Sequence, residues 1–126
     1  MHGINNPSID YKDTLSKSYN EEASYDIVMA NPPFTGKLDK GDINPDLRID
    51  SGSTELLFLI RISKMLRAGG KAAVIIPEGV LFGSSGAQKA TREILLKDNR
   101  IEVVITLPLD AFKPYTCVKT AILVFM

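Results

Sequence analysis

The sequence has few of the residues that build disulfides, metal centres or hydrolase triads. Its 126 residues include one cysteine, Cys117, and one histidine, His2. A single cysteine excludes an internal disulfide and suits a reducing, cytoplasmic compartment. One histidine and one cysteine make no plausible metal cluster, and His2 lies in a terminal segment without a nucleophile pattern. We therefore expect neither a metal site nor a Ser-His-Asp triad.

The sequence also lacks net charge and long apolar runs. Fifteen Lys and Arg residues balance 15 Asp and Glu residues. A protein that binds DNA by charge alone normally carries a clear excess of basic residues. Any sequence-specific binding of DNA must therefore come from something other than the net charge of this chain. No signal peptide is visible, and the apolar stretches are far shorter than a membrane span. The length and the 44% hydrophobic content fit one globular core.

The tetrapeptide Asn31-Pro32-Pro33-Phe34 follows the apolar run 25–30. Its residues suit methylation of a weakly nucleophilic nitrogen, whose lone pair is drawn into an adjacent π-system. The Asn31 side-chain oxygen and the Pro32 carbonyl could each accept one N–H and stabilise the developing positive charge. Two prolines hold that backbone rigid, and Phe34 offers a ring face to a flipped base. The alternative interpretation is a strand-ending turn.

The apolar periodicity predicts an α/β fold with short connections. Strands are expected at 9–11, 25–30, 71–76, 101–106 and 118–125, with 71–76 buried on both faces. One helix should begin at Ser53 and end at Gly69-Gly70, and a second should span 85–97 with Ser84 or Ser85 as its cap. Gly3 should close a terminal helix end, and 35–52 should form a long mixed-charge loop.

The chain order predicts which ends of these strands meet. Strands joined through helices should be parallel, whereas the last strand follows 101–106 through a loop alone and should pair with it as an antiparallel hairpin. Ligands of open α/β sheets lie beyond the carboxyl ends of the parallel strands. Asn31, Pro77 and Phe112 all lie past such ends, so we expect them to converge on one rim.

Three segments together resemble the N6-adenine DNA methyltransferases, and most closely the modification subunit of type I restriction-modification systems. They are Asn31–Phe34, Pro77–Phe82 and Phe112–Thr120. The resemblance covers nearly the whole chain. It implies a partial Rossmann-like fold that uses S-adenosylmethionine, with a parallel sheet ending in an antiparallel hairpin strand. Residues 1–126 would form one partial catalytic domain, with a lead-in at 1–24 and the catalytic half at 25–126.

The same resemblance implies an activity, partners and roles for particular residues. The reaction would transfer a methyl group to N6 of a flipped adenine in double-stranded DNA, in a complex with a specificity subunit and a restriction subunit. Asn31, Pro32, Pro33 and Phe34 would be catalytic. Phe112 would help hold the extruded adenine, although the Ala-Phe-Lys-Pro loop could equally bury this ring in the core. Apart from the resemblance, Glu78 follows Pro77 near the same rim, and since the reaction needs no general base we expect it to give structural support.

Two features of such enzymes are missing from the sequence. No glycine-rich turn for S-adenosylmethionine precedes residue 31, and no acidic ribose-binding residue is present. The turn Asp13-Thr14-Leu15 matches the family's aspartate that accepts a hydrogen bond from the cofactor adenine, while the alternative is a turn or helix-capping aspartate. We therefore expect the fragment to be inactive alone, with an incomplete sheet.

Two other functions are compatible with the tetrapeptide. Enzymes that methylate a protein glutamine side chain also use an Asn-Pro-Pro-aromatic sequence, but Pro77–Phe82 and Phe112–Thr120 look like the DNA enzymes. The chain could also be a truncated remnant that folds without catalysing transfer.

Overall fold

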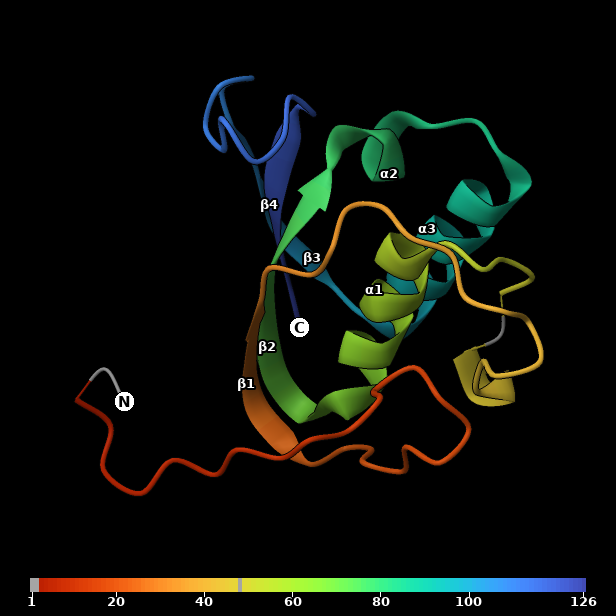
Figure 1. Ribbon diagram of the computed structural model, residues 1–126, viewed down its shortest axis with the longest axis vertical. Helices are drawn as coiled ribbons and strands as arrows, with labels where there is room; N and C mark the ends of the chain where they lie inside the picture. Colours follow the sequence, from red (N-terminus) through yellow and green to blue (C-terminus); the bar gives the residue numbers. More distant parts are fainter. Residues whose placement is uncertain (1–2, 48) are drawn as a thin grey trace.

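The computed structural model describes residues 3–47 and 49–126 (Figure 1), so the predictions at Met1, His2 and Arg48 lie outside the described residues. The strands are β1 (Tyr25–Ala30), β2 (Leu66–Pro77), β3 (Ile101–Thr106) and β4 (Thr120–Phe125). The helices are α1 (Thr54–Met65), α2 (Glu78–Phe82), α3 (Gly86–Asp98) and the short 3-10 helix η1 (Pro45–Leu47). None of the described helices has the length and apolar content needed to cross a membrane.

The four strands form one sheet in the order β1-β2-β4-β3. β1 is parallel to β2, and β4 is antiparallel to both β2 and β3. β1, β2 and β3 therefore share one direction. This confirms the predicted α/β fold with an antiparallel C-terminal hairpin strand, which lies between the two strands that precede it in sequence. The connection from β3 to β4 contains no helix, so it reverses the chain direction.

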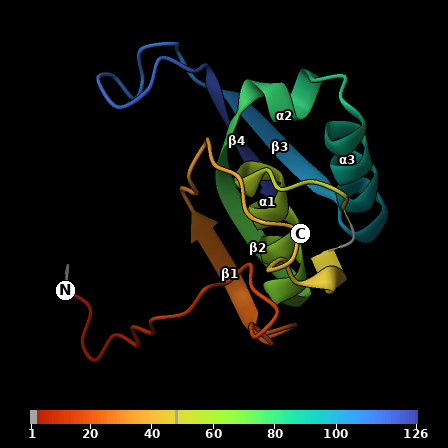
Figure 2. The ribbon, with the colours of Figure 1, turned by 45° about the vertical axis from the view of Figure 1, so that its right-hand side comes forward.

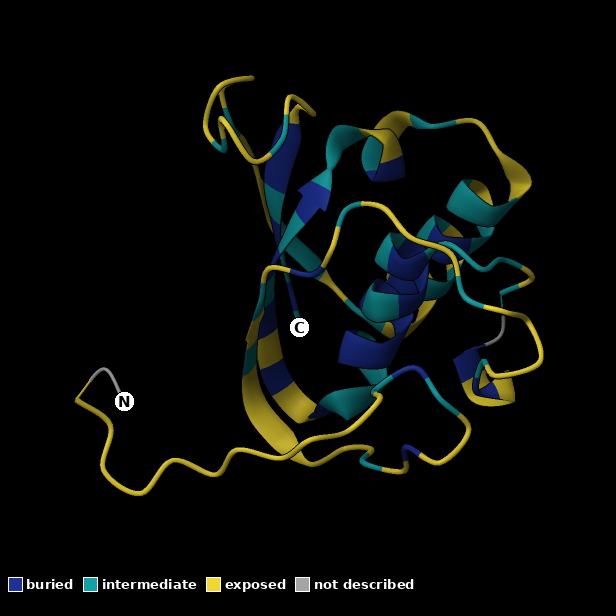
Figure 3. Ribbon diagram, viewed as in Figure 1, coloured by how far each residue is buried: buried dark blue, intermediate teal, exposed yellow. Residues whose placement is uncertain are grey.

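The three α-helices lie on the same side of the sheet (Figures 1 and 2). The inward residues Val74 and Ile76 of β2 are fully buried beneath them, whereas Ala73 and Ile75 on the other face are half-buried. The expected burial of this strand on both faces is therefore wrong (Figure 3). The largest fully buried apolar side chains of the core come from α1, β2 and β4 and from η1: Leu47, Leu57, Leu59, Ile60, Val74, Ile76 and Phe125.

The end of α1 differs from the prediction. The helix stops at Met65, and Leu66 is already extended with φ −70° and ψ 134°. The carbonyls of Lys64 and Met65 accept the N–H groups of Ala23 and Ser24, at 2.8 and 2.9 Å, in place of a glycine cap.

Gly69 and Gly70 lie inside β2 rather than ending the helix. The pairing with β1 shifts register there, because Tyr25 pairs with Leu66 and Ile27 pairs with Lys71. Gly69 adopts φ +81°, and a Cβ on Gly70 would lie 2.9 Å from the carbonyl oxygen of Tyr25. The glycines accommodate an irregular strand pairing, which the sequence pattern alone did not distinguish from a helix end.

The strand expected at 9–11 is also wrong. The segment is extended but has no strand assignment, and Ile9 and Tyr11 are exposed. A strand needs a hydrogen-bonded neighbour, and among the described residues β1 pairs only with β2. β1 is therefore an edge strand, with Ile27 at 70% and Met29 at 81% exposure. Near the same terminus, Gly3 lies in a turn with φ +76°.

The second helix and its cap are confirmed. Ser85 is the N-cap of α3, its hydroxyl accepts the N–H of Gln88, and the Gln88 side chain accepts the N–H of Ser85. This capping box satisfies two backbone donors locally. Ser53 is the N-cap of α1 as expected, although its side chain makes no capping bond.

Candidate active site

Two loops that are far apart in sequence meet at the carboxyl end of the sheet. The loop after β1 carries Phe34, and the loop between β3 and β4 carries Phe112; both leave the same end of the sheet (Figures 1 and 2). The two ring centroids are 6.1 Å apart with an interplanar angle of 74°, an edge-to-face contact. Both rings are half-buried. The contact brings the loop that begins at Asn31 against the loop that carries Phe112; a direct meeting of Asn31, Pro77 and Phe112 themselves stays a prediction.

Asn31 and Pro32 lie at the tip of β1 in different environments. Asn31 is exposed and Pro32 is buried. Asn31 borders a mostly apolar hollow of about 370 Å³, lined by Met29, Ala30, Ala73, Ile75 and Ile122 as well. The proline ring restricts the backbone at Pro32, and the Asn31 residue is exposed beside the hollow; their role as an acceptor pair stays a prediction.

The loop 107–119 is fastened at both ends. The N–H of Leu107 donates to the carbonyl oxygen of Thr120 at 3.0 Å, and the N–H of Glu78 donates to the carbonyl oxygen of Lys119 at 2.8 Å. The Glu78 carboxylate also lies 3.8 Å from Lys119 Nζ. Glu78 thus joins the start of α2 to the end of the loop that carries Phe112, in agreement with its predicted structural role.

Asp13 lies in a turn apart from these aromatic rings. Its Oδ1 accepts the N–H of Leu15 at 3.2 Å, and its carbonyl accepts the N–H of Ser16. Figure 1 shows segment 13–24 near the end of the sheet where β1 begins. This geometry is that of a turn aspartate, while the exposed side chain remains accessible. Its contact with a cofactor stays a prediction.

A polar cluster near the start of β1 was not foreseen, because segment 16–24 reads as an ordinary polar loop. The Glu21 carboxylate accepts hydrogen bonds from Lys12 Nζ, Tyr19 Oη and Tyr25 Oη at 2.9, 2.9 and 2.8 Å. These bonds, that of Lys12 first, lower the pKa of Glu21 to about 2. Burial and the bond to Glu21 raise the pKa of Tyr19 to about 12.

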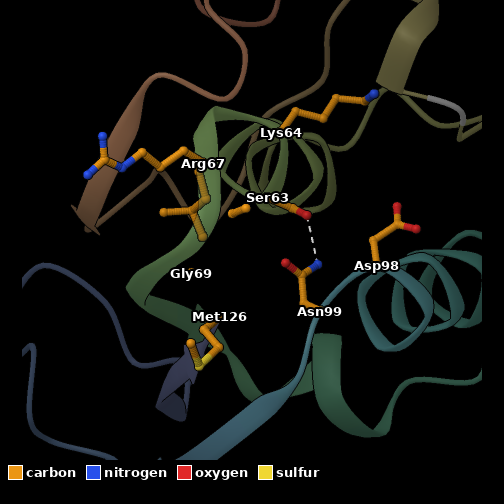
Figure 4. Close-up of a pocket in the computed structure, with 9 residues that line it drawn as sticks. Ser63, Lys64, Arg67, Gly69, Asp98, Asn99 and Met126 are labelled. Carbon is orange, nitrogen blue, oxygen red and sulfur yellow. Dashed lines mark hydrogen bonds between the residues drawn. The ribbon is translucent and has the colours of Figure 1, made fainter.

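A polar hollow of about 460 Å³ lies where α1 and α3 end and β2 begins (Figure 4). A hydrogen bond of 2.7 Å from Asn99 Nδ2 to Ser63 Oγ crosses it. It is lined by none of the residues predicted to act in catalysis. Because β2 starts here, the hollow is at the amino end of the parallel strands, away from the end that carries Asn31.

The family model for N-6 DNA methylases matches residues 1–126. This chain belongs to that family. It is 35% identical to the methylase subunit of the type I restriction enzyme EcoEI from Escherichia coli, over 99% of the chain and 26% of the relative. It is 31% identical to the EcoKI methylase subunit from E. coli K12, over 79% of the chain and 18% of that relative. The chain thus spans about a quarter or less of these proteins.

Solved structures agree with this assignment. A modification subunit from Vibrio vulnificus YJ016, assigned to a type I restriction enzyme, matches with a TM-score of 0.80 and 31% identity. The match covers 98% of the chain and 28% of that protein. The EcoKI M protein matches with a TM-score of 0.76 and 30% identity, over 90% of the chain and 23% of that protein. The resemblance to modification subunits and the methyltransferase fold are therefore confirmed.

Proposed function

We propose that this chain supplies the target-base side of a DNA methyltransferase that transfers methyl from S-adenosylmethionine to N6 of adenine, as part of a type I modification complex. The observation that carries the proposal is the contact between Phe34 and Phe112 beside Asn31. Two aromatic rings meet, one of them three residues after the exposed Asn31, at the edge of the sheet where α/β folds generally bind ligands. Family membership favours adenine in DNA over a protein glutamine as the acceptor.

Asn31 and Pro32 act on the nitrogen that receives the methyl group. The Asn31 side-chain oxygen and the Pro32 carbonyl accept the two N–H bonds of the adenine amino group. As the new N–C bond forms, positive charge develops on that nitrogen, and both oxygens stabilise it. Pro32 is buried and Pro33 follows it, so the acceptor carbonyl is fixed before the base arrives.

Phe34 and Phe112 hold the flipped base. A base taken out of the duplex loses stacking on its neighbours, and an aromatic ring replaces part of that energy, about 1–3 kcal/mol for each base. The two rings contact each other edge-to-face. A base that stacks on Phe34 therefore either displaces the Phe112 ring from this contact or has the Phe112 ring against the edge of the base.

S-adenosylmethionine supplies the electrophilic methyl group. Asp13, which is exposed, matches the family's acceptor for the adenine amino group of the cofactor. No glycine-rich turn occurs before residue 31. The residues present therefore fit the cofactor only in part. The chain spans about a quarter of the length of its relative, and the remaining cofactor contacts would come from other parts of a full-length subunit.

The balanced charge of the chain is consistent with a complex in which a different subunit recognises the DNA sequence. Fifteen basic and 15 acidic residues give no electrostatic excess for holding DNA. We assign target-sequence recognition to a separate specificity subunit and cleavage to a restriction subunit.

The test is to identify the methylated product of a full-length methylase subunit that carries this chain, assembled with its specificity subunit. Duplex DNA and labelled S-adenosylmethionine are the substrates, and mass spectrometry of the nucleosides is the measurement. N6-methyladenine supports the proposal. Label on cytosine, or on glutamine of an added protein, overturns it.

A further inference from the structure

An arginine in the middle of α1 is one of the most deeply buried side chains of the protein. Arg61 is 1% exposed. Its Nε–H donates to the carbonyl oxygen of Thr14 at 2.7 Å, and its guanidinium lies over the Tyr19 ring, 4.8 Å from the centroid. Both contacts reach the segment that begins at Asp13.

The burial of this cation is costly. The two Nη atoms of Arg61 are buried and have no hydrogen-bond partner among the described residues. Burial lowers the pKa of Arg61, while the negative charges of Glu22 and Asp46 act in the opposite direction. A buried cation with unsatisfied donors is weak evidence for stability, because apolar side chains of similar volume often stabilise a protein equally well or better. Its two directed contacts instead point to a positioning role.

The same turn is tied to the loop that follows Phe34. The N–H of Asn44 donates to the carbonyl of Leu15 at 3.0 Å, and Asn44 Nδ2 donates to the carbonyl of Tyr19 at 3.2 Å. Asn44 and Leu15 are buried, and Ser16 forms an isolated bridge with Ile43. Arg61 therefore fixes a turn that also contacts the loop leading from the catalytic tetrapeptide to α1.

We propose that Arg61 is a positioning residue that fixes the Asp13-Thr14-Leu15 turn on α1 and so holds the Asp13 carboxylate in place for the cofactor. The proposal rests on the proposed function, because it assumes that Asp13 contacts S-adenosylmethionine. Arg61 itself touches neither substrate nor cofactor.

The test compares Arg61→Met with two variants in the full-length methylase subunit. Arg61→Lys keeps the charge but loses the planar guanidinium. Arg92→Met is the control, since the Arg92 guanidinium likewise donates to backbone carbonyls, those of Val80 and Gly83 at 2.8 and 2.7 Å, but in a turn remote from Asp13 in sequence. The measurements are the Kd for S-adenosylmethionine by calorimetry, kcat at saturating cofactor, Tm, and hydrogen exchange of segment 13–19.

The expected result separates positioning from stability. Arg61→Met raises the Kd about tenfold to a hundredfold, as for one lost charge-assisted hydrogen bond. It speeds exchange in segment 13–19, changes kcat little, and leaves Tm equal or higher. Arg61→Lys is intermediate, and Arg92→Met lowers Tm without changing the Kd. An unchanged Kd with Arg61→Met, or a joint fall of Tm, affinity and kcat, overturns the proposal.

A variant of Asp13 distinguishes the failure of this inference from that of the cofactor assignment. Asp13→Ala should raise the Kd, and Arg61→Met added to it should have no further effect. If Asp13→Ala raises the Kd and Arg61→Met does not, the positioning role alone is wrong. If Asp13→Ala leaves the Kd unchanged, Asp13 does not bind the cofactor, and the positioning role of Arg61 is wrong as well. The proposed function is then still tested separately, by the identity of the methylated product.

Discussion

The Phe34 and Phe112 rings contact each other edge-to-face, with centroids 6.1 Å apart, although 77 residues separate them along the chain. This contact joins the loop after β1 to the loop between β3 and β4, across the positions of β2 and β4 in the sheet. The contact brings two loops together that are distant in sequence, and the proposed roles of both rings can be tested by substitution.

Asn31→Ala in a full-length methylase subunit should leave cofactor binding nearly intact and reduce methyl transfer by about 10²–10³-fold. The reason is the loss of one acceptor for the charge that develops on the amine, worth on the order of 3 kcal/mol. Methyl incorporation under single-turnover conditions measures the rate. The exposed Asn20→Ala is the matched control and should behave as wild type. Transfer by Asn31→Ala within tenfold of wild type would remove this residue from the mechanism.

Phe34→Ala should weaken binding of DNA with a mismatched target base by about 1–3 kcal/mol, the range for stacking of one base on an aromatic side chain. Phe34→Tyr should retain most of the affinity. Fluorescence of 2-aminopurine at the target position reports stacking, because the ring quenches it. Phe82→Ala, at a residue that is 71% exposed, is the control. Equal quenching by the Ala variant and the wild type would show that the Phe34 ring serves only in packing.

The isolated 126-residue chain should bind S-adenosylmethionine weakly or not at all. Asp13 offers about one charge-assisted hydrogen bond, worth roughly 1.5–3 kcal/mol, whereas immobilising a ligand costs at least about 4 kcal/mol. Titration calorimetry on the isolated chain is the measurement, with a full-length subunit as the positive control. Micromolar affinity for the chain alone would mean that it contains a cofactor site other than the Asp13 turn.

Glu21 should make the protein sensitive to acid. Its folded-state pKa of about 2 is below the ordinary value of 4.5, so its stabilising effect is complete above about pH 4.5 and is lost as the pH falls toward 2. Glu21→Gln should therefore lower Tm at pH 7 and flatten the decrease of Tm between pH 4.5 and 2. Thermal unfolding followed by circular dichroism across this range is the measurement. Glu93→Gln, at an exposed carboxylate of α3, is the control, and equal pH profiles for Glu21→Gln and the wild type would contradict the role of this cluster.

Local features of the structure were predictable because neighbouring residues determine them. The Ser85 cap of α3 depends on Gln88 three residues later, and the β3–β4 reversal depends on a connection without a helix. The position of Asn31 at a strand end followed from the apolar run before it. Only a meeting of strand ends was predictable, namely those that precede Asn31, Pro77 and Phe112; the contact between Phe34 and Phe112 was not predicted, because the sequence pattern gives neither distances nor ring orientations.

Other features were decided by tertiary contacts. α1 ends at Met65 because Leu66 pairs with Tyr25 of β1, which overrides the glycine signal four residues later. Residues 9–11 have strand-like side chains, but within the part of the chain that the structure describes they pair with no strand. Arg61 is buried although its charge predicts exposure, because Thr14 and the Tyr19 ring of segment 13–19 pack against it. The sequence by itself determined the helix cap, the strand directions and the chemistry of the tetrapeptide, since these depend on adjacent residues. Only the tertiary structure decided where α1 ends and which polar groups are buried, because both depend on segments that are distant in the chain.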